Sequence, residues 1–252
     1  MRKELLCCLL ASFVVTGCAK PVFMEMDKMT GVGFPPDFVV DTSTGASVTL
    51  DDIYSADNKA RIALDVKKDN TSIPAENTVN NQRLHDLMTA NRNPAFGETA
   101  KKWTSYQIVV KKYGPNPSVL GIMFDYLGSD LDNLPREGSA VFYDAHAAPW
   151  SGQRLQDELF LTSAHELGHS FNLHHTDWEG TSFYNGSTIM SYSLTPDVLW
   201  RISSSSTEHL RRTKNHPKLY VKPRTNAKPF GTITTYHCNN HQVTPLELYT
   251  CE

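Results

Sequence analysis

The sequence predicts an α+β domain in which a mixed, twisted β-sheet packs against one long helix and a second, C-terminal helix. Before residue 145, short stretches alternate between apolar and polar residues, as in YQIVVKKY at 106–113. Apolar residues then recur at helical spacing over 155–171, and a Ser205-x-x-Glu208 capping box marks the start of another helix. Strands gathered ahead of helices are typical of the α+β class.

The first 18 residues read as an export signal. Arg2 and Lys3 precede an apolar run over 5–15 that is too short to span a bilayer. Val15-Thr16-Gly17-Cys18 fits a bacterial lipobox, which would leave Cys18 as a lipidated first residue, and the same region also fits an ordinary signal-peptidase site. We expect a protein exported from a bacterial cell, as an outer-membrane or surface lipoprotein, or otherwise as a secreted or periplasmic protein.

The remaining chain divides into three parts by composition. Residues 19–45 are rich in Pro, Gly, Ser and Thr, which predicts an N-terminal arm or tether. Residues 46–214 form the predicted main domain, and the basic, proline-punctuated segment 215–252 is predicted to form a C-terminal appendage. Within the domain we expect strands over 61–67, 106–113, 119–126 and 139–144, and a helix over 74–91.

A metal-binding pattern lies in the predicted long helix, in the string HELGHSFNLHH at 165–175. His165 and His169 are four residues apart, so both side chains lie on one face of a helix and can converge on one ion. Glu166 follows the first histidine, where a carboxylate can reach a metal-activated water as a general base. The two faces of this helix are expected to differ. Phe160, Ala164, Leu167 and Phe171 should face the core, and Glu158, Thr162, His165 and His169 should face a cleft.

A catalytic zinc needs a third protein ligand and an open position. His175 is six residues past His169, so the chain must turn sharply between them, and Asn172 tolerates the left-handed backbone that ends a helix. His174 is the alternative third ligand.

Together with STIMSY at 187–192, this string resembles the metzincin clan of zinc metallopeptidases, with Asn172 where the family usually has glycine. The resemblance implies that His165, His169 and His175 bind zinc and that Glu166 is the general base. It also implies that Met190 forms the apolar floor of a Met-turn. Tyr192 matches the tyrosine that serralysin- and astacin-like members use as an extra ligand or transition-state donor.

A softer likeness to the matrixins, a metzincin group, extends the resemblance to about residues 119–213. It implies a substrate-binding edge strand formed by Leu120, Gly121, Ile122, Met123 and Phe124, which would pair with an extended peptide. Val141 and Ile122 stand where matrixins carry histidines for a structural zinc, so we expect no such zinc. No cysteine lies between 19 and 237, which excludes a cysteine-switch propeptide.

Calcium is a further possible cofactor, at an acidic set of residues: Asp130, Asp132 and Asp144. Cys238 and Cys251 are the two cysteines left after Cys18, and in an exported protein they most simply form a disulfide. The alternative for this region is a metal cluster of His237, Cys238 and His241.

The predicted function is zinc-dependent endopeptidase activity on protein or peptide substrates. The formal net charge of −3 and the absence of a basic stripe interleaved with aromatic residues exclude nucleic acid as a partner, and the membrane would be reached only through an N-terminal lipid. Two alternatives stay open. One is an exported, toxin-like effector protease that docks a carrier subunit through its C-terminal tail. The other is a non-catalytic surface module that retains zinc as structure.

Overall fold

The computed structural model describes 20–55, 62–93, 103–124, 138–171, 173, 175, 188–191, 200–202, 207, 210, 237–238 and 241–242. All structural statements below concern these residues.

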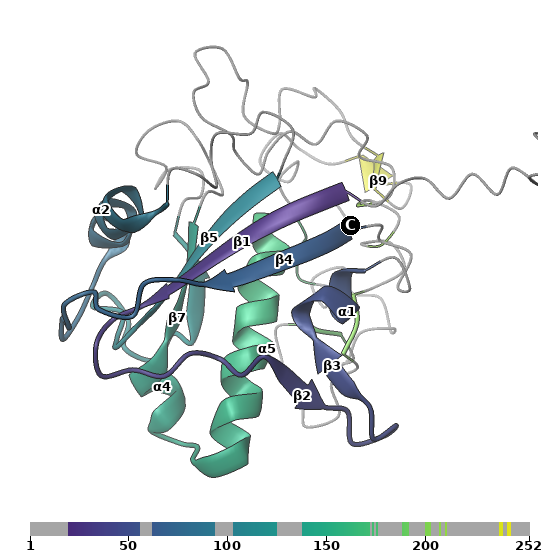
Figure 1. Ribbon diagram of the computed structural model, residues 1–252, viewed down its shortest axis with the longest axis horizontal. Coiled ribbons are helices and arrows are strands. Elements are labelled where there is room, and N and C mark those ends of the chain that lie inside the picture. The colour runs from purple at the N-terminus through teal and green to yellow at the C-terminus, as the bar shows by residue number, and fades with distance from the viewer. Residues whose placement is uncertain are drawn as a thin grey trace, which may run out of the picture.

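A five-stranded sheet with the order β4-β1-β5-β7-β6 forms the centre of the molecule (Figure 1). Its strands are β1 (Lys20–Lys28), β4 (Ile62–Lys68), β5 (Trp103–Val110), β6 (Gly121–Met123) and β7 (Gly138–Phe142). The first four strands in this order are parallel, and β6 pairs with β7 in the antiparallel direction. The sheet is therefore mixed, as expected, but mostly parallel, which gives a mixed α/β arrangement.

Short helices and a hairpin surround the sheet. The helices are α1 (Leu50–Tyr54), α2 (Asn81–Asn91), α4 (Tyr143–Ala147) and α5 (Gly152–Ser170), and the hairpin joins β2 (Phe38–Val40) to β3 (Ser47–Thr49). Figure 1 shows α5 running across the sheet behind β1, β4 and β5, with α1 and the hairpin to one side of it. None of the described helices combines the length and apolar character needed to cross a bilayer.

Two clusters of buried apolar side chains form the core. One surrounds β1, α1 and the C-terminal half of α5, and includes Met24, Tyr54 and Leu167. The other surrounds α2, β5, β7 and the N-terminal half of α5. Helix α5 thus belongs to both clusters, which fixes it firmly relative to the sheet.

The prediction of an N-terminal arm over 19–45 is wrong for its first third, because β1 pairs with both β4 and β5 inside the sheet. Within this strand, Glu25 and Asp27 are 2% and 0% exposed. Asp27 accepts hydrogen bonds from the Tyr106 hydroxyl (3.0 Å) and the Asn70 N–H (2.8 Å), and Glu25 accepts from the Asn93 N–H (3.0 Å). Hydrogen-bond donors from distant parts of the chain allow these two carboxylates to be buried, and the local sequence does not indicate such donors.

The other predicted elements lie close to their expected positions. The helix expected over 74–91 begins only at Asn81, because Val79 makes a β-bridge with Tyr113 and Asn80 caps the helix through its side chain. The capping box at Ser205 and Glu208 lies outside the described residues. In the C-terminal appendage, β8 (His237–Cys238) pairs with β9 (His241–Gln242), whereas Cys18 and Cys251 are not described.

Candidate metal centre

Helix α5 carries the first two histidines, and its apolar face is buried as its periodicity predicts. Phe160, Ala164, Leu167 and Phe171 are at most 2% exposed. The opposite face differs from the expectation, because Glu158 and Thr162 are also buried, each 3% exposed. Strand β6 packs over this part of the helix, and from Glu158 to Ser170 only His165 and His169 remain partly exposed.

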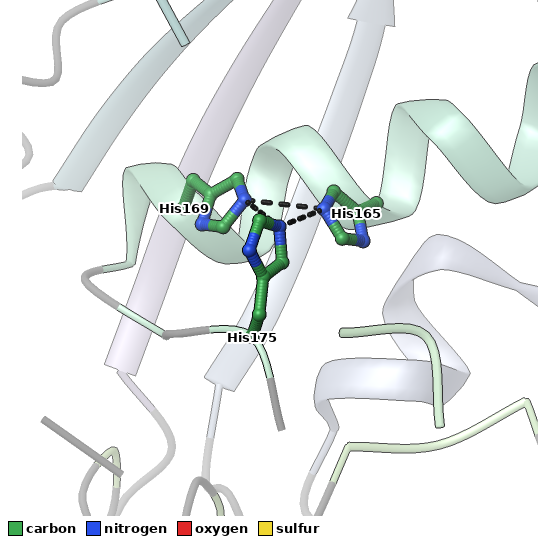
Figure 2. A group of neighbouring side chains, drawn as sticks. All are labelled: His165, His169 and His175. Carbon is green, nitrogen blue, oxygen red and sulfur yellow. Dashed lines mark hydrogen bonds between the residues drawn. The ribbon is translucent and has the colours of Figure 1, made fainter. Parts of the chain in front are cut away.

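Three imidazole rings converge at the C-terminal end of α5 (Figure 2). The Nε2 atoms of His165 and His169 are 3.1 Å apart, and the Nε2 atom of His175 lies 2.9 Å from the first and 3.0 Å from the second. His175 comes from the segment after α5, which reverses direction as the Leu173 N–H donates to the Gly168 carbonyl group at 3.0 Å. His174 and Asn172 are outside the described residues.

Backbone carbonyl groups fix the orientation of the first two rings. His165 Nδ1 lies 2.6 Å from the Ile189 carbonyl oxygen, and His169 Nδ1 lies 2.8 Å from that of Leu173. A carbonyl oxygen only accepts, so each Nδ1 carries the proton and each neutral ring directs the lone pair of Nε2 into the centre. The sequence could not predict that these two carbonyl groups orient the rings, because any residue at 189 or 173 supplies a carbonyl group.

The donor set fits a zinc ion. Lone pairs that face each other at about 3 Å repel unless a proton or a cation lies between them. Two nitrogens bound at roughly 2.0–2.1 Å to one tetrahedral ion are about 3.4 Å apart, a few tenths of an ångström more than the separations observed here. Hydrogen bonds from the outer ring nitrogen to carbonyl oxygens are the usual support for metal-binding histidines.

Glu166 projects from the same helix toward β6. Its side chain is 6% exposed, and it packs so closely on Gly121 that a Cβ atom there would lie 2.7 Å from Glu166 Oε1. Burial raises the pKa of Glu166 to about 8, and a hydrogen bond from the Met123 N–H opposes this shift. A carboxyl group with a pKa near neutrality can both accept and return a proton.

Strand β6 lies at the edge of the sheet as the structure describes it, where Leu120 to Phe124 were expected to bind substrate. The Phe142 N–H donates to the Leu120 carbonyl group at 2.9 Å, and the Phe124 N–H donates to that of Gly138 at 3.2 Å. In an antiparallel ladder, every second residue directs its backbone N–H and carbonyl groups to the partner strand and the others direct theirs away from it. The backbone groups of Gly121 and Met123 therefore face the open edge.

Met190 lies beneath the histidines, on the far side of α5 from β6. It is fully buried, and a Cβ atom on Gly168 would overlap its Sδ atom. The turn around it is closed by a hydrogen bond from the Ser191 N–H to the Thr188 carbonyl group at 3.0 Å. Tyr192, the predicted transition-state donor, lies outside the described residues.

Among the described residues, the three histidines form the one group of three or more His, Cys, Asp or Glu side chains close enough to share an ion. Asp144 therefore belongs to no such group, and Asp130 and Asp132 are not described.

No protein-family model matches the chain, and no curated protein matches it either. Among solved structures, the chain is similar to the crystal structure of metalloproteinase-II from Bacteroides fragilis, with 12% sequence identity and a TM-score of 0.40. The match covers 78% of this chain and 54% of the other, so this chain spans about half the length of that protein. An identity and a TM-score this low carry no argument about activity, which depends instead on the side chains of the site.

Proposed function

We propose that the protein is a metzincin-like zinc peptidase that hydrolyses peptide bonds in protein or peptide substrates. The observation that carries this proposal is the convergence of three Nε2 atoms within 3.1 Å of one another, beside a buried glutamate on the same helix. A purely structural zinc has four protein ligands and no use for a general base.

The residues of the site take distinct roles. A zinc ion bound by His165, His169 and His175 would polarise the scissile carbonyl group and lower the pKa of the attacking water. Glu166 accepts a proton from that water and then transfers it to the leaving amine. A zinc ion held by the histidines would favour the charged form of Glu166 and so lower its pKa from the value of about 8.

The open edge of β6 supports an extended substrate. The outward backbone groups of Gly121 and Met123 match the spacing of an added antiparallel strand. The Met123 N–H currently donates to Glu166, so a substrate carbonyl group that took this N–H would leave the carboxylate free to turn toward the histidines. Tyr192 is proposed as the donor to the developing oxyanion, where loss of one donor costs about 10²–10³ in rate.

The test is cleavage of a broad peptide library by the purified protein and by Glu166→Gln, with zinc content measured for both. We expect the wild type to cut and the variant to bind about one zinc with activity lower by a factor of at least 10³. Glu158→Gln is the matched control, because Glu158 is a second buried glutamate, two turns earlier on α5, paired with Arg154. A wild type that binds zinc but cuts nothing would refute the peptidase proposal.

We also propose that the chain is exported and that Cys18 carries lipid. Ala19 alone would then separate this cysteine from β1, so the domain would lie within about 10 Å of its anchor, without a flexible tether. Mass spectrometry of the N-terminal peptide from cells, compared with Cys18→Ser, tests this. An unmodified peptide that starts after a signal-peptidase cut would instead indicate free secretion.

A further inference from the structure

A buried glutamine lies between the sheet and the helix that carries the metal-binding histidines. Gln107 is on β5 and is fully buried. Its Nε2 group donates to the Ser139 hydroxyl on β7 (3.1 Å) and to the Ser163 carbonyl group on α5 (3.2 Å). Its Oε1 atom accepts from the Ser163 hydroxyl at 2.6 Å. Both donors and the acceptor of the amide are thus used.

These hydrogen bonds hold α5 at Ser163, immediately before the metal-binding histidines. Ser163 is two residues ahead of His165, and successive helical residues are turned by about 100°. His165 and His169 therefore lie at about 200° and 240° from Ser163, on the far side of the helix from the sheet. A small rotation of α5 at Ser163 would displace both histidines, and Glu166 with them.

A second contact holds the next residue from another direction. The Tyr54 hydroxyl on α1 donates to the Ala164 carbonyl group at 2.6 Å, and the Tyr54 ring packs edge-on against Phe171 at 4.9 Å. Two consecutive carbonyl groups of α5 are thus bonded to side chains of different elements. Hydrogen bonds are directional, whereas apolar packing tolerates small rotations, so these bonds define the angle of the helix more sharply than the core does.

We propose that Gln107 is a positioning residue. Through Ser163 it sets the rotation and axial position of α5, so that the histidines point toward the metal and Glu166 lies where it can act on the substrate. The expected effect on kcat rests on the proposed peptidase function, whereas the expected effect on metal affinity rests on the metal centre alone. An apolar residue at 107 would fill the same space without fixing the helix angle. A buried amide is costly unless fully bonded, so its presence here is well explained by this role.

The test compares Gln107→Met, which keeps the side-chain length but removes the polar groups, with the double variant Gln107→Met/Ser163→Ala. The double variant also removes the hydroxyl partner on the helix, so fewer polar groups are left unbonded and stability recovers in part. Tyr106→Phe is the matched control. It removes one buried hydrogen bond, to Asp27, from the neighbouring residue on the opposite face of β5.

Each protein is assayed for kcat and KM at saturating zinc, for stability in urea, and for cobalt and zinc affinity by chelator competition. We expect Gln107→Met to lower kcat by a factor of about 10–100 with KM changed less than about twofold, and to weaken metal binding about tenfold. In the double variant, stability should recover while kcat and metal affinity stay low. Tyr106→Phe should lose stability without these losses.

Three results would overturn the inference. They are unchanged kcat and metal affinity in Gln107→Met, recovery of kcat together with stability in the double variant, and an equal loss of kcat in Tyr106→Phe. If the wild type binds metal but cleaves no peptide, the peptidase proposal fails while the metal affinities still decide whether Gln107 positions the histidines.

Discussion

At the scale of single residues, Gly121 decides where the proposed base can lie. A Cβ atom at this position would be 2.6 Å from Thr162 Cγ2 and 2.7 Å from Glu166 Oε1, closer than such contacts occur. We predict that Gly121→Ala moves the Glu166 carboxylate and lowers kcat about 10- to 100-fold, since misplacement by about 1 Å can cost this much. Zinc content should stay at that of the wild type, because the atoms nearest to the added methyl group belong to Thr162 and Glu166, not to the metal-binding histidines.

Adding Thr162→Ser to Gly121→Ala removes the Cγ2 atom and part of the crowding, so it should restore part of kcat. Thr162→Ser alone should change kcat by less than about threefold. Steady-state kinetics on the four proteins measure this, and full activity in Gly121→Ala would show that the contact has no influence on the base.

His146 is a second residue whose environment has a measurable consequence. It is fully buried on α4, its ring lies 5.7 Å from that of Trp150, and burial lowers its pKa from 6.5 to about 4. The folded protein thus binds the proton less readily than the unfolded chain. The titration of His146 therefore costs no stability above pH 6.5, and it lowers the free energy of unfolding as the pH decreases from 6.5 toward 4.

We predict that His146 accounts for a loss of about 2 kcal/mol in unfolding free energy between pH 7.5 and pH 5.0. His146→Phe keeps an aromatic ring beside Trp150 and removes the titration, so the same pH change should cost it about 2 kcal/mol less. Urea unfolding of both proteins at both pH values measures the difference. Loss of metal at low pH affects both proteins alike. Equal pH responses would mean that the folded and unfolded chains bind the proton of His146 equally well, so that burial does not lower its pKa.

At the scale of elements, the sequence predicts local patterns well and long-range partners poorly. The periodicity of α5 correctly places Phe160 and Leu167 in the core, and the alternation at 106–113 correctly identifies β5. Strand β1 was missed because the Pro, Gly, Ser and Thr content of 19–45 predicted a tether. The carboxylates of this strand, Glu25 among them, are buried. Their bonding partners lie up to 79 residues away, and no local pattern specifies such contacts.

In the candidate site, too, the local pattern was predictable and the long-range partners were not. The convergence of His165 and His169 was predictable from helix geometry, and the choice of His175 over His174 was predictable only from the spacing that the metzincin resemblance implies. The supports of the site were not: the Ile189 and Leu173 carbonyl groups are backbone atoms, and the roles of Gln107 and Tyr54 depend on which strand and helix lie beside α5.

The turn around Met190 and the helix α5 are two elements whose packing makes a sharp prediction. Alanine favours a helix over glycine by about 1 kcal/mol, yet a Cβ atom on Gly168 would overlap Met190 Sδ. We predict that Gly168→Ala destabilises the wild type by about 1–3 kcal/mol. In a Met190→Ala background the overlap with Sδ is gone, and the Tyr54 hydroxyl at 3.0 Å is the close contact that remains. The substitution should then cost less than about 1 kcal/mol.

Thermal or urea unfolding of the two single variants and the double variant gives the coupling energy, which we expect to exceed about 1 kcal/mol. Met190→Ala alone should cost about 2–5 kcal/mol, as for other buried methionines. Additive effects would indicate that the turn and the helix do not pack as described.

At the scale of the whole molecule, the metal ligands lie beside the core, and none of the three histidines belongs to it. The three histidines join the C-terminal end of α5 to the segment at 173–175, and through the Ile189 carbonyl group to the turn at 188–191. Two apolar clusters hold the sheet and the rest of α5, and they include no metal ligand, although Leu173, Ile189 and Met190 belong to one of them. Metal removal should therefore loosen one end of the molecule without unfolding it.

We predict that chelation lowers the unfolding free energy by RT ln(1 + [metal]/Kd), about 4 kcal/mol at a free metal concentration 1,000 times Kd, while the apoprotein stays folded. Hydrogen exchange should rise at 173–175 and 188–191 and remain slow in β1, β5 and the N-terminal half of α5. His175→Ala, which removes the ligand outside the helix, should show this exchange pattern with or without zinc. Loss of protection throughout β1 and β5 on chelation would instead mean that the fold depends on the metal, as in small zinc domains. The buried clusters on both sides of α5 argue for the local response.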